Sequence, residues 1–157
     1  MTTESPTAAS RPRPTEPVIE WTDRLLLGDN EMDAEHRDFV ICVQALQQAE
    51  AAQVAERLQA FADHARRHFG AEDAWMTETD FPARGCHIDE HAAVLKSVAE
   101  VQALVAQGNT AIVRSLADEL ARWFPGHADY LDSALAAWMT KRRWNAKPVV
   151  LRRNILE

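Results

Sequence analysis

The sequence predicts an all-α protein, an up-down-up-down four-helix bundle that follows a disordered N-terminal tail. Apolar residues recur every three or four positions over four long segments, which is the period of a helix that buries one face. The chain also has only five glycines and no segment with the alternation typical of a strand. We therefore expect helices over residues 32–49, 52–78, 85–107 and 110–143.

Residues with turn preferences separate these helices. The first break falls at 50–53, the second at FPARG (81–85) and the third at GNT (108–110). Pro and Gly interrupt a helix, while Asn and Thr are favoured where the next one begins. These breaks give four helices and leave no room for a strand.

The chain divides into a tail, one domain and a short extension. Residues 1–17 are rich in Thr, Ser and Pro and have little to bury, so we expect them to be disordered. Residues 18–147 are expected to form the bundle, because 157 residues that are 46% apolar and 26% charged can supply one core. Residues 148–157 form a basic C-terminal extension.

Charge and composition argue against several classes of protein. A net charge of −7 would repel a phosphate backbone, so nucleic acid is not an expected partner. Cys42 and Cys86 lie far apart without ligand spacing, which gives no support to a disulfide framework or a thiolate zinc site. No apolar run approaches the roughly 20 residues of a membrane span. We expect a cytoplasmic protein without a membrane partner.

Polar residues occupy inward positions on the first three predicted helices. On the first, His36 shares a face with Val40 and Val43. The inward stripe of the second advances by three and four residues, and that of the third begins with two imidazoles. The members of these two stripes are Val54, Leu58, Phe61, Ala65, His68, Glu72 and Met76, and His87, His91, Val94, Val98, Val101 and Val105.

The fourth helix contains one irregular step. Its inward stripe reaches His127 and resumes at Asp132, five residues later. Five residues turn an ideal helix by roughly 140° away from the starting face, so the two side chains cannot share it. Pro125 stands just before this step, and a kink or a one-residue π-bulge there would turn both side chains inward.

Each of these residues taken singly has an ordinary explanation, such as a core histidine or a pair on a solvated helix face. Together, five imidazoles and two carboxylates would be costly to bury without partners. A metal centre removes that cost. The set exceeds the four ligands of one zinc ion and suits two first-row metals bridged by the carboxylates, because imidazole predominates over oxygen.

The sequence resembles the hemerythrin family over residues 21–144. The segment from Trp21 to His36 matches the opening W…G…[IM]D..H pattern of that family, and HFGAE (68–72) matches its HFxxE motif. HIDEH (87–91) supplies HxxxH, and the stretch from Trp123 to Asp132 supplies W-x3-H-x4-D. Ferritin-like proteins, which use inward Glu-x-x-His motifs, are the alternative, but no Glu here has a His three residues later.

The resemblance implies a hemerythrin-like fold around a non-haem di-iron site. One iron would be bound by three histidines and the other by two, with two bridging carboxylates and a solvent-derived oxo or hydroxo bridge. The vacant position on the two-histidine iron would take O2. The ligands implied are His87, His91 and His127 on one iron, His36 and His68 on the other, and Glu72 and Asp132 between them.

The leading functional hypothesis is an O2-binding protein for storage, delivery or sensing, with O2 or another small diatomic as ligand. The alternative is a redox enzyme that consumes O2, peroxide or nitric oxide at the same irons, and a third possibility is metal storage. Whether the protein is an enzyme stays open. An electron-donor protein is a possible further partner.

Three residues beside the ligand positions receive separate predictions. Trp123 and Tyr130 are assigned to the O2 pocket, because they flank His127 and the family usually presents a leucine where Tyr130 stands. A phenol there would favour sensing or peroxide chemistry, and the alternative is that Tyr130 points outward. His64 is predicted to be a solvated flanking residue rather than a ligand, and the alternative is that it supports the ligands from beside them.

Overall fold

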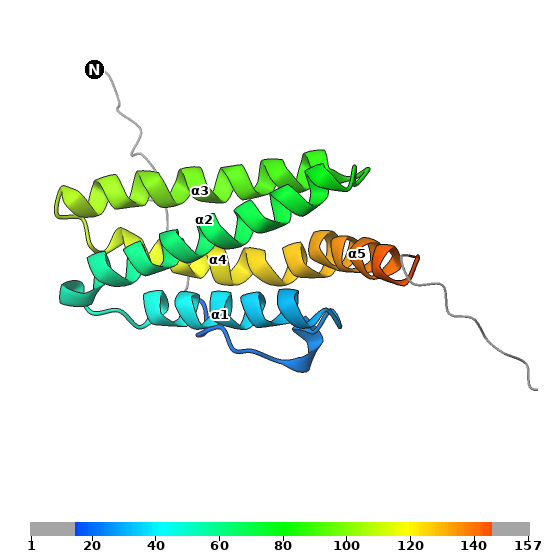
Figure 1. Cartoon of the computed structure of the whole chain (residues 1–157). Helices are drawn as coiled ribbons and strands as arrows, with labels where there is room; N and C mark the ends of the chain where they lie inside the picture. Colours follow the sequence, from blue (N-terminus) through cyan, green and yellow to red (C-terminus); the bar gives the residue numbers. More distant parts are fainter. Residues whose placement is uncertain (1–14, 146–157) are drawn as a thin grey trace, which may run out of the picture.

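Four long helices lie side by side and form the bundle (Figure 1). The computed structural model describes residues 15–145, and within that range it contains no strand. Near the C-terminal end of the bundle the fourth helix is extended by a π-helical segment and a further helix, α5, which continues along the same line. The helices are α1 (Asn30–Gln47), α2 (Val54–Glu78), α3 (Arg84–Ala106), α4 (Ile112–His127), the π segment η3 (Ala128–Asp132) and α5 (Ser133–Asn145).

The predicted helices are confirmed, with boundaries that move by about two residues for local reasons. The helix α1 begins at Asn30 because the carboxylate of Asp29 accepts hydrogen bonds from the backbone N–H groups of Glu31 and Met32. A 3₁₀ turn, η2 (Ala51–Gln53), delays the start of α2 to Val54. The predicted π-bulge is also confirmed, as η3.

The entry to α1 is fixed by a second carboxylate. Asp33 accepts hydrogen bonds from the backbone N–H groups of Leu27 and Gly28, at 2.8 and 3.1 Å. Gly28 has a φ of 84°, a conformation that a side chain would strain. The turn before α1 is therefore held from both sides, and it sets the rotation of the helix that carries His36.

Two apolar clusters fill the bundle on either side of a polar layer. On α1, Met32 belongs to the smaller cluster and Val40 to the larger one, with His36 one turn from each. On α2, Glu72 lies in the same way between Phe69 and Met76. The polar layer is thus enclosed by hydrocarbon at both ends.

At the far end of the bundle, a polar network holds the segment before α1. Arg114 donates to the backbone carbonyl of Glu16, and the side-chain amide of Gln47 donates to that of Pro17. Glu16 and Pro17, the last two residues of the predicted tail, are therefore bonded to the bundle. Residues 1–14, and the predicted extension at 148–157, lie outside the described residues.

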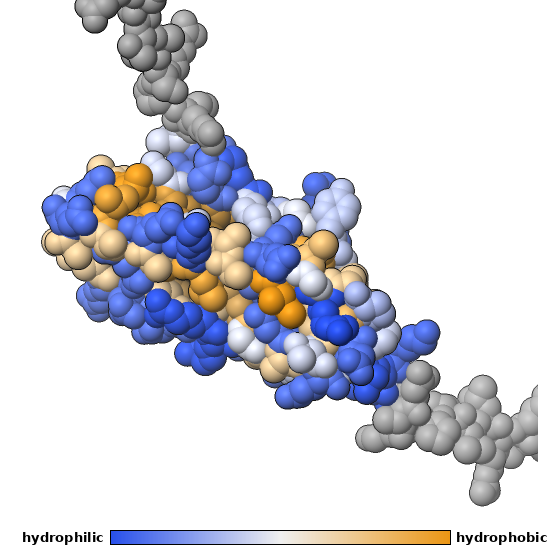
Figure 2. Space-filling view, turned by 90° about the horizontal axis from the view of Figure 1, so that it is seen from above, coloured by the Kyte–Doolittle hydropathy of each residue, from blue (hydrophilic) through white to orange (hydrophobic). Residues whose placement is uncertain are grey.

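The surface above α3 mixes charged and apolar residues (Figure 2). Apolar residues gather towards the end where α3 runs into the loop before α4, and Leu104 there is exposed. Within the described part of the chain, every helix is too short or too polar to cross a bilayer.

Candidate metal centre

Seven buried side chains meet in the polar layer, and they are the seven predicted as ligands. The helices α1, α2 and α3 supply five of them at positions set by their inward stripes, and α4 and η3 supply His127 and Asp132. The π segment supplies the step that an α-helix could not make, because its wider turn leaves both His127 and Asp132 inward. The full set is His36, His68, Glu72, His87, His91, His127 and Asp132.

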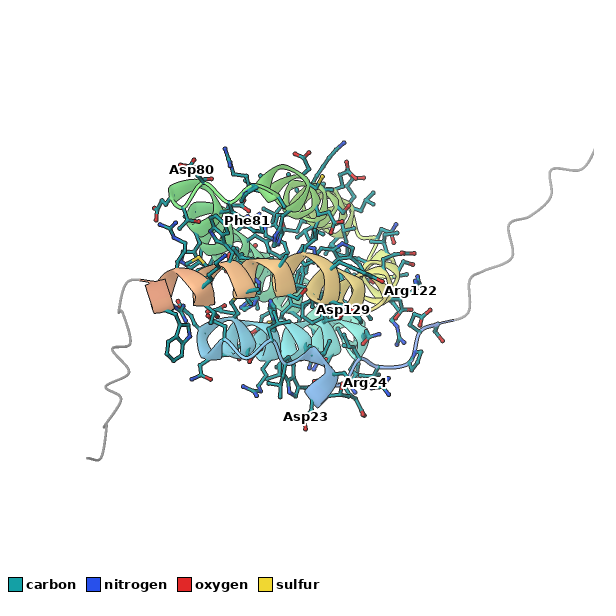
Figure 3. All side chains as sticks on the ribbon, turned by 90° about the vertical axis from the view of Figure 1, so that its right-hand side faces the viewer. Asp23, Arg24, Asp80, Phe81, Arg122 and Asp129 are labelled. Atoms are coloured by element: carbon teal, nitrogen blue, oxygen red, sulfur yellow. The ribbon has the colours of Figure 1, made fainter. Side chains whose placement is uncertain are left out.

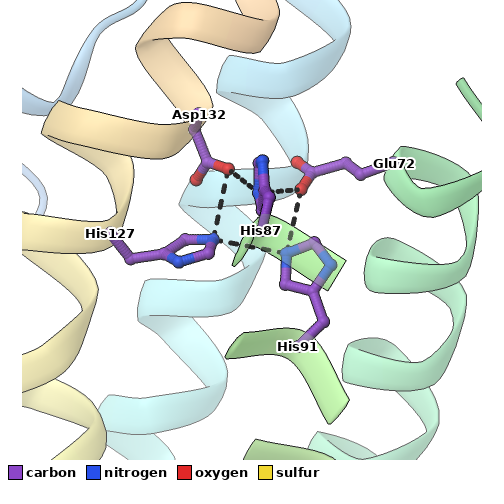
Figure 4. Close-up of side chains that lie close together, drawn as sticks. All are labelled: Glu72, His87, His91, His127 and Asp132. Atoms are coloured by element: carbon purple, nitrogen blue, oxygen red, sulfur yellow. Dashed lines mark hydrogen bonds and ion pairs between the residues drawn. The ribbon is translucent and has the colours of Figure 1, made fainter. Parts of the chain in front are cut away.

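Asp132 lies among histidines from three helices, and Figure 4 shows its contacts with two of them, His87 and His127. Its Oδ2 is 3.1 Å from Nε2 of His36 on α1. Its Oδ1 is 2.9 Å from Nε2 of His87 and 3.2 Å from Nε2 of His127. One carboxylate thus reaches the histidines of both predicted groups.

Glu72 occupies the corresponding place on the opposite side. Its Oε1 is 3.0 Å from Nε2 of His68 and 3.6 Å from Nε2 of His36. Its Oε2 is 3.3 Å from Nε2 of His91 and 3.5 Å from Nε2 of His87. Each oxygen of Glu72 therefore faces one group of histidines, which is the arrangement expected of a bridging ligand.

Several of these polar atoms are buried without a hydrogen bond of acceptable geometry, although their neighbours are close. They include Nε2 of His36, Nε2 of His87, Oε2 of Glu72 and both carboxylate oxygens of Asp132. Leaving a buried polar group unpaired costs about 1–3 kcal/mol, and more when it is charged. Imidazole nitrogens and carboxylate oxygens converging in this way form a donor set that fits first-row metal cations.

The site also attracts positive charge by itself. Burial would lower the pKa of His36 and of His87, but contacts with the carboxylates of Asp132 and Glu72 outweigh it and raise each pKa to about 9. Burial would raise the pKa of Glu72, and the surrounding histidines hold it well below its usual range. The pKa of Asp132 is lowered too, against its burial and the negative charge of Glu72. The imidazole nitrogens that hold protons here are the atoms that metal cations would bind in their place.

Two carboxylates outside the seven orient imidazoles, and the sequence analysis missed both. Asp73 accepts a hydrogen bond from Nδ1 of His91 at 2.7 Å, and Glu90 accepts one from Nδ1 of His127 at 2.7 Å. A carboxylate on the far nitrogen fixes the ring and directs Nε2 inward. Each acid is adjacent to a predicted ligand in the sequence, which is the signal that could have found them.

Trp123 lies close to the cluster, as its predicted pocket role requires. Its ring centroid is 4.2 Å from that of His127, and its indole N–H donates to Glu90 at 3.2 Å. Trp123 therefore supports the same carboxylate that orients His127. An O2-binding role for Trp123 stays a prediction.

The prediction that Tyr130 covers the pocket is wrong. Its side chain is 77% exposed, so the outward alternative describes the structure. The neighbouring Asp129 lines a surface pocket of about 570 Å³ together with Arg24, and both residues are labelled in Figure 3. The part of η3 between His127 and Asp132 thus presents its polar side chains to solvent.

The expectation that His64 is solvated is also wrong. His64 is only 5% exposed, and its ring packs edge-on against His68, with centroids 5.4 Å apart. Its Nε2 has no hydrogen-bond partner and lies 3.9 Å from Oε2 of Glu35.

Comparison with known proteins identifies the family. A family model described as the hemerythrin HHE cation binding domain matches residues 27–139. The chain is 39% identical over 131 residues to a bacteriohemerythrin of Ralstonia nicotianae, covering 83% of this chain and 96% of that protein. It is 29% identical over 123 residues to a bacteriohemerythrin of Stenotrophomonas maltophilia, covering 76% and 80% of the two chains. With a helical bundle enclosing seven histidine and carboxylate side chains at its core, the chain belongs to the hemerythrin family.

Proposed function

We propose that the protein binds two iron ions at the polar layer and uses them to bind O2 reversibly. The observation that carries the proposal is that Glu72 and Asp132 each lie between both groups of histidines. Two carboxylates in such positions suit a pair of metals better than a single ion.

The ligands divide as the geometry of the carboxylates suggests. His87, His91 and His127 would hold one iron, and His36 and His68 would hold the other, with an oxo or hydroxo bridge completing the pair. A bound iron pair would supply the two electrons that reversible O2 binding requires. The side with two histidines has one ligand fewer, and O2 or another small diatomic would bind there.

The residues around the two-histidine side are suited to excluding water. The ring of His36 meets Phe124 edge-on at 5.3 Å between centroids, and Phe39 lies 6.2 Å from His68. Both phenylalanines are fully buried. A dry apolar surrounding disfavours the charged products of oxidation and so favours return of O2.

The proposed role is storage, delivery or sensing of O2. A Tyr130 side chain in the pocket would have favoured sensing or peroxide chemistry, and its exposure removes that support for either role. A cytoplasmic location and an electron-donor partner remain predictions.

Metal analysis combined with an anaerobic O2 titration tests the proposal. The protein reconstituted with ferrous iron should hold two irons per chain, bind one O2 per pair and release it under vacuum with the iron still ferrous. Irreversible oxidation on the first addition of O2 would support the redox alternative, and one metal per chain would reject the di-iron site.

A further inference from the structure

Asp73 and Glu90, the two carboxylates that orient imidazoles from outside the seven, are each adjacent in sequence to one of the seven. Asp73 is adjacent to Glu72 on α2 and accepts from His91 on α3, whereas Glu90 is adjacent to His91 on α3 and accepts from His127 on α4. Consecutive residues on a helix are rotated by roughly 100°, so a residue next to an inward ligand points towards the neighbouring helix. The helices α2 and α3 thereby each orient a histidine of the helix that follows.

On α1, Glu35 occupies the position that Glu90 occupies on α3, directly before an inward histidine. It is adjacent to His36, and its Oε2 faces α2, where it lies 3.9 Å from Nδ1 of His68 and 3.9 Å from Nε2 of His64. All three atoms are buried and lack a hydrogen-bond partner. They also lie within 4.8 Å of one another, so they converge on one point.

The chemistry of the three groups is complementary. A carboxylate accepts hydrogen bonds, and each imidazole has a ring N–H to donate. Contact at 3.9 Å exceeds a hydrogen bond by about 1 Å. The Glu35 side chain is 38% exposed and therefore free to make that movement, while His64 and His68 are held by packing.

We propose that Glu35 orients His68 by accepting from its Nδ1–H, and that His64 holds Glu35 in place by donating to the same carboxylate. Glu35 is a positioning residue, because it acts on the metal through His68. This inference rests on the proposed di-iron function. It gives the two-histidine side the same kind of support that Asp73 and Glu90 give the three-histidine side.

The experiment compares iron retention in Glu35→Ala, Glu35→Gln and His64→Phe. The rate at which ferrous iron passes to a strong chelator is measured for each variant. Loss of an orienting group typically costs 10- to 100-fold in metal affinity. We expect Glu35→Ala to release one iron about tenfold faster than the wild type. Glu35→Gln, which keeps an accepting oxygen, should restore most of the retention, and His64→Phe should be intermediate. Glu31→Ala, on the exposed side of the same helix, is the matched control.

The outcomes separate the two proposals. The iron count of the wild type tests the di-iron function, whereas the ratio between variants tests the positioning role and can be measured with Co²⁺ in place of iron. Retention in Glu35→Ala equal to that in Glu31→Ala would overturn the inference. So would a Glu35→Gln variant as weak as Glu35→Ala. A third metal ion in the wild type that disappears in Glu35→Ala and His64→Phe would show that these atoms bind a cation instead. Melting of the metal-free variants by circular dichroism checks that each one folds.

Discussion

Two buried aspartates at opposite ends of the bundle have contrasting surroundings. Asp118 accepts hydrogen bonds from the side chains of Gln47 at 3.1 Å and Arg114 at 2.9 Å, and from a backbone N–H at 3.3 Å. The oxygens of Asp132 face the imidazoles of His36, His87 and His127, and Glu72 places a second negative charge nearby. The chain satisfies the first carboxylate with its own donors, whereas it leaves both oxygens of the second without a hydrogen bond. Burial of an acid therefore does not define a site, but burial without satisfied partners does.

The two ends of the bundle should differ most in bound metal when a metal-binding side chain is removed. Glu72→Ala is expected to reduce bound metal from two per chain to well below two, because both histidine groups lose a shared oxygen. The metal-loaded protein should lose about 3 kcal/mol of the stability that bound metal supplies at saturating concentration. Metal analysis and denaturation with and without metal measure both effects. Asp118→Ala is the control and should keep two metals, so equal metal loss in both variants would contradict the comparison.

Substitution of Asp118 should lower the stability of the fold without any dependence on metal. Asp118→Ala should lower the free energy of unfolding by about 1–3 kcal/mol, because the amide of Gln47 loses a buried partner. Urea denaturation should give the same loss for the metal-free and the metal-loaded protein. A loss that appears only in the loaded protein would mean that Asp118 acts on the metal site.

The response to pH should separate the two states of the metal end. In the metal-free protein the pKa values of His36 and His87 are raised from 6.5 to about 9, so their stabilising contribution is complete below pH 6.5 and is lost as pH rises towards 9. The lowered pKa values of Glu72 and Asp132 add stability that is lost in acid, below their ordinary range. The metal-free bundle should thus weaken from pH 6.5 to 9.

Metal binding should have the reverse dependence, because the same imidazoles must release protons before they can bind metal. Thermal melts at several pH values measure this contrast. A metal-free protein whose stability is flat between pH 6.5 and 9 would contradict the assignment of two protonated histidines.

The smallest effect is expected on the outer side of η3. Tyr130→Leu should leave the rate of autoxidation and the metal content unchanged, since the phenol is exposed. Its effect on stability should stay within about 0.5 kcal/mol, as for most surface changes. Following the oxy form by its visible absorption tests this, and a longer lifetime in the variant would restore a pocket role for Tyr130.

Helical periodicity predicted the four helices and the inward position of all seven site residues. The irregular step from His127 to Asp132 could also be predicted, because two residues five apart cannot lie on the same face of an α-helix. The outward orientation of Tyr130 could not be predicted from the sequence. On an α-helix a residue three after an inward one returns to within roughly 60° of the same face. The wider π turn leaves it outside, and the amount of that rotation depends on tertiary packing.

The outer residues were missed for a different reason. Asp73, Glu90 and His64 lie at the edges of their stripes, where periodicity alone does not decide between solvent and a neighbouring helix. Whether such a side chain is buried depends on which helix packs beside it. His64 is covered because Phe39 and His68 pack against it across the contact between α1 and α2.

The π segment also determines which face of the following helix, α5, points into the bundle. The helices α4 and α5 form one rod in space, but the widened turn between them rotates the inward stripe of α5 relative to that of α4. Leu135 and Ala136, which complete the smaller apolar cluster, face inward in that rotated register, as Asp132 does. The one extra residue in the π turn therefore directs both Asp132 and the apolar residues of α5 into the bundle. A deletion anywhere from Ala128 to Leu131 would withdraw a carboxylate from the histidines and an apolar cap from the bundle in a single step, so the length of this segment is as much a determinant of the site as any of its side chains.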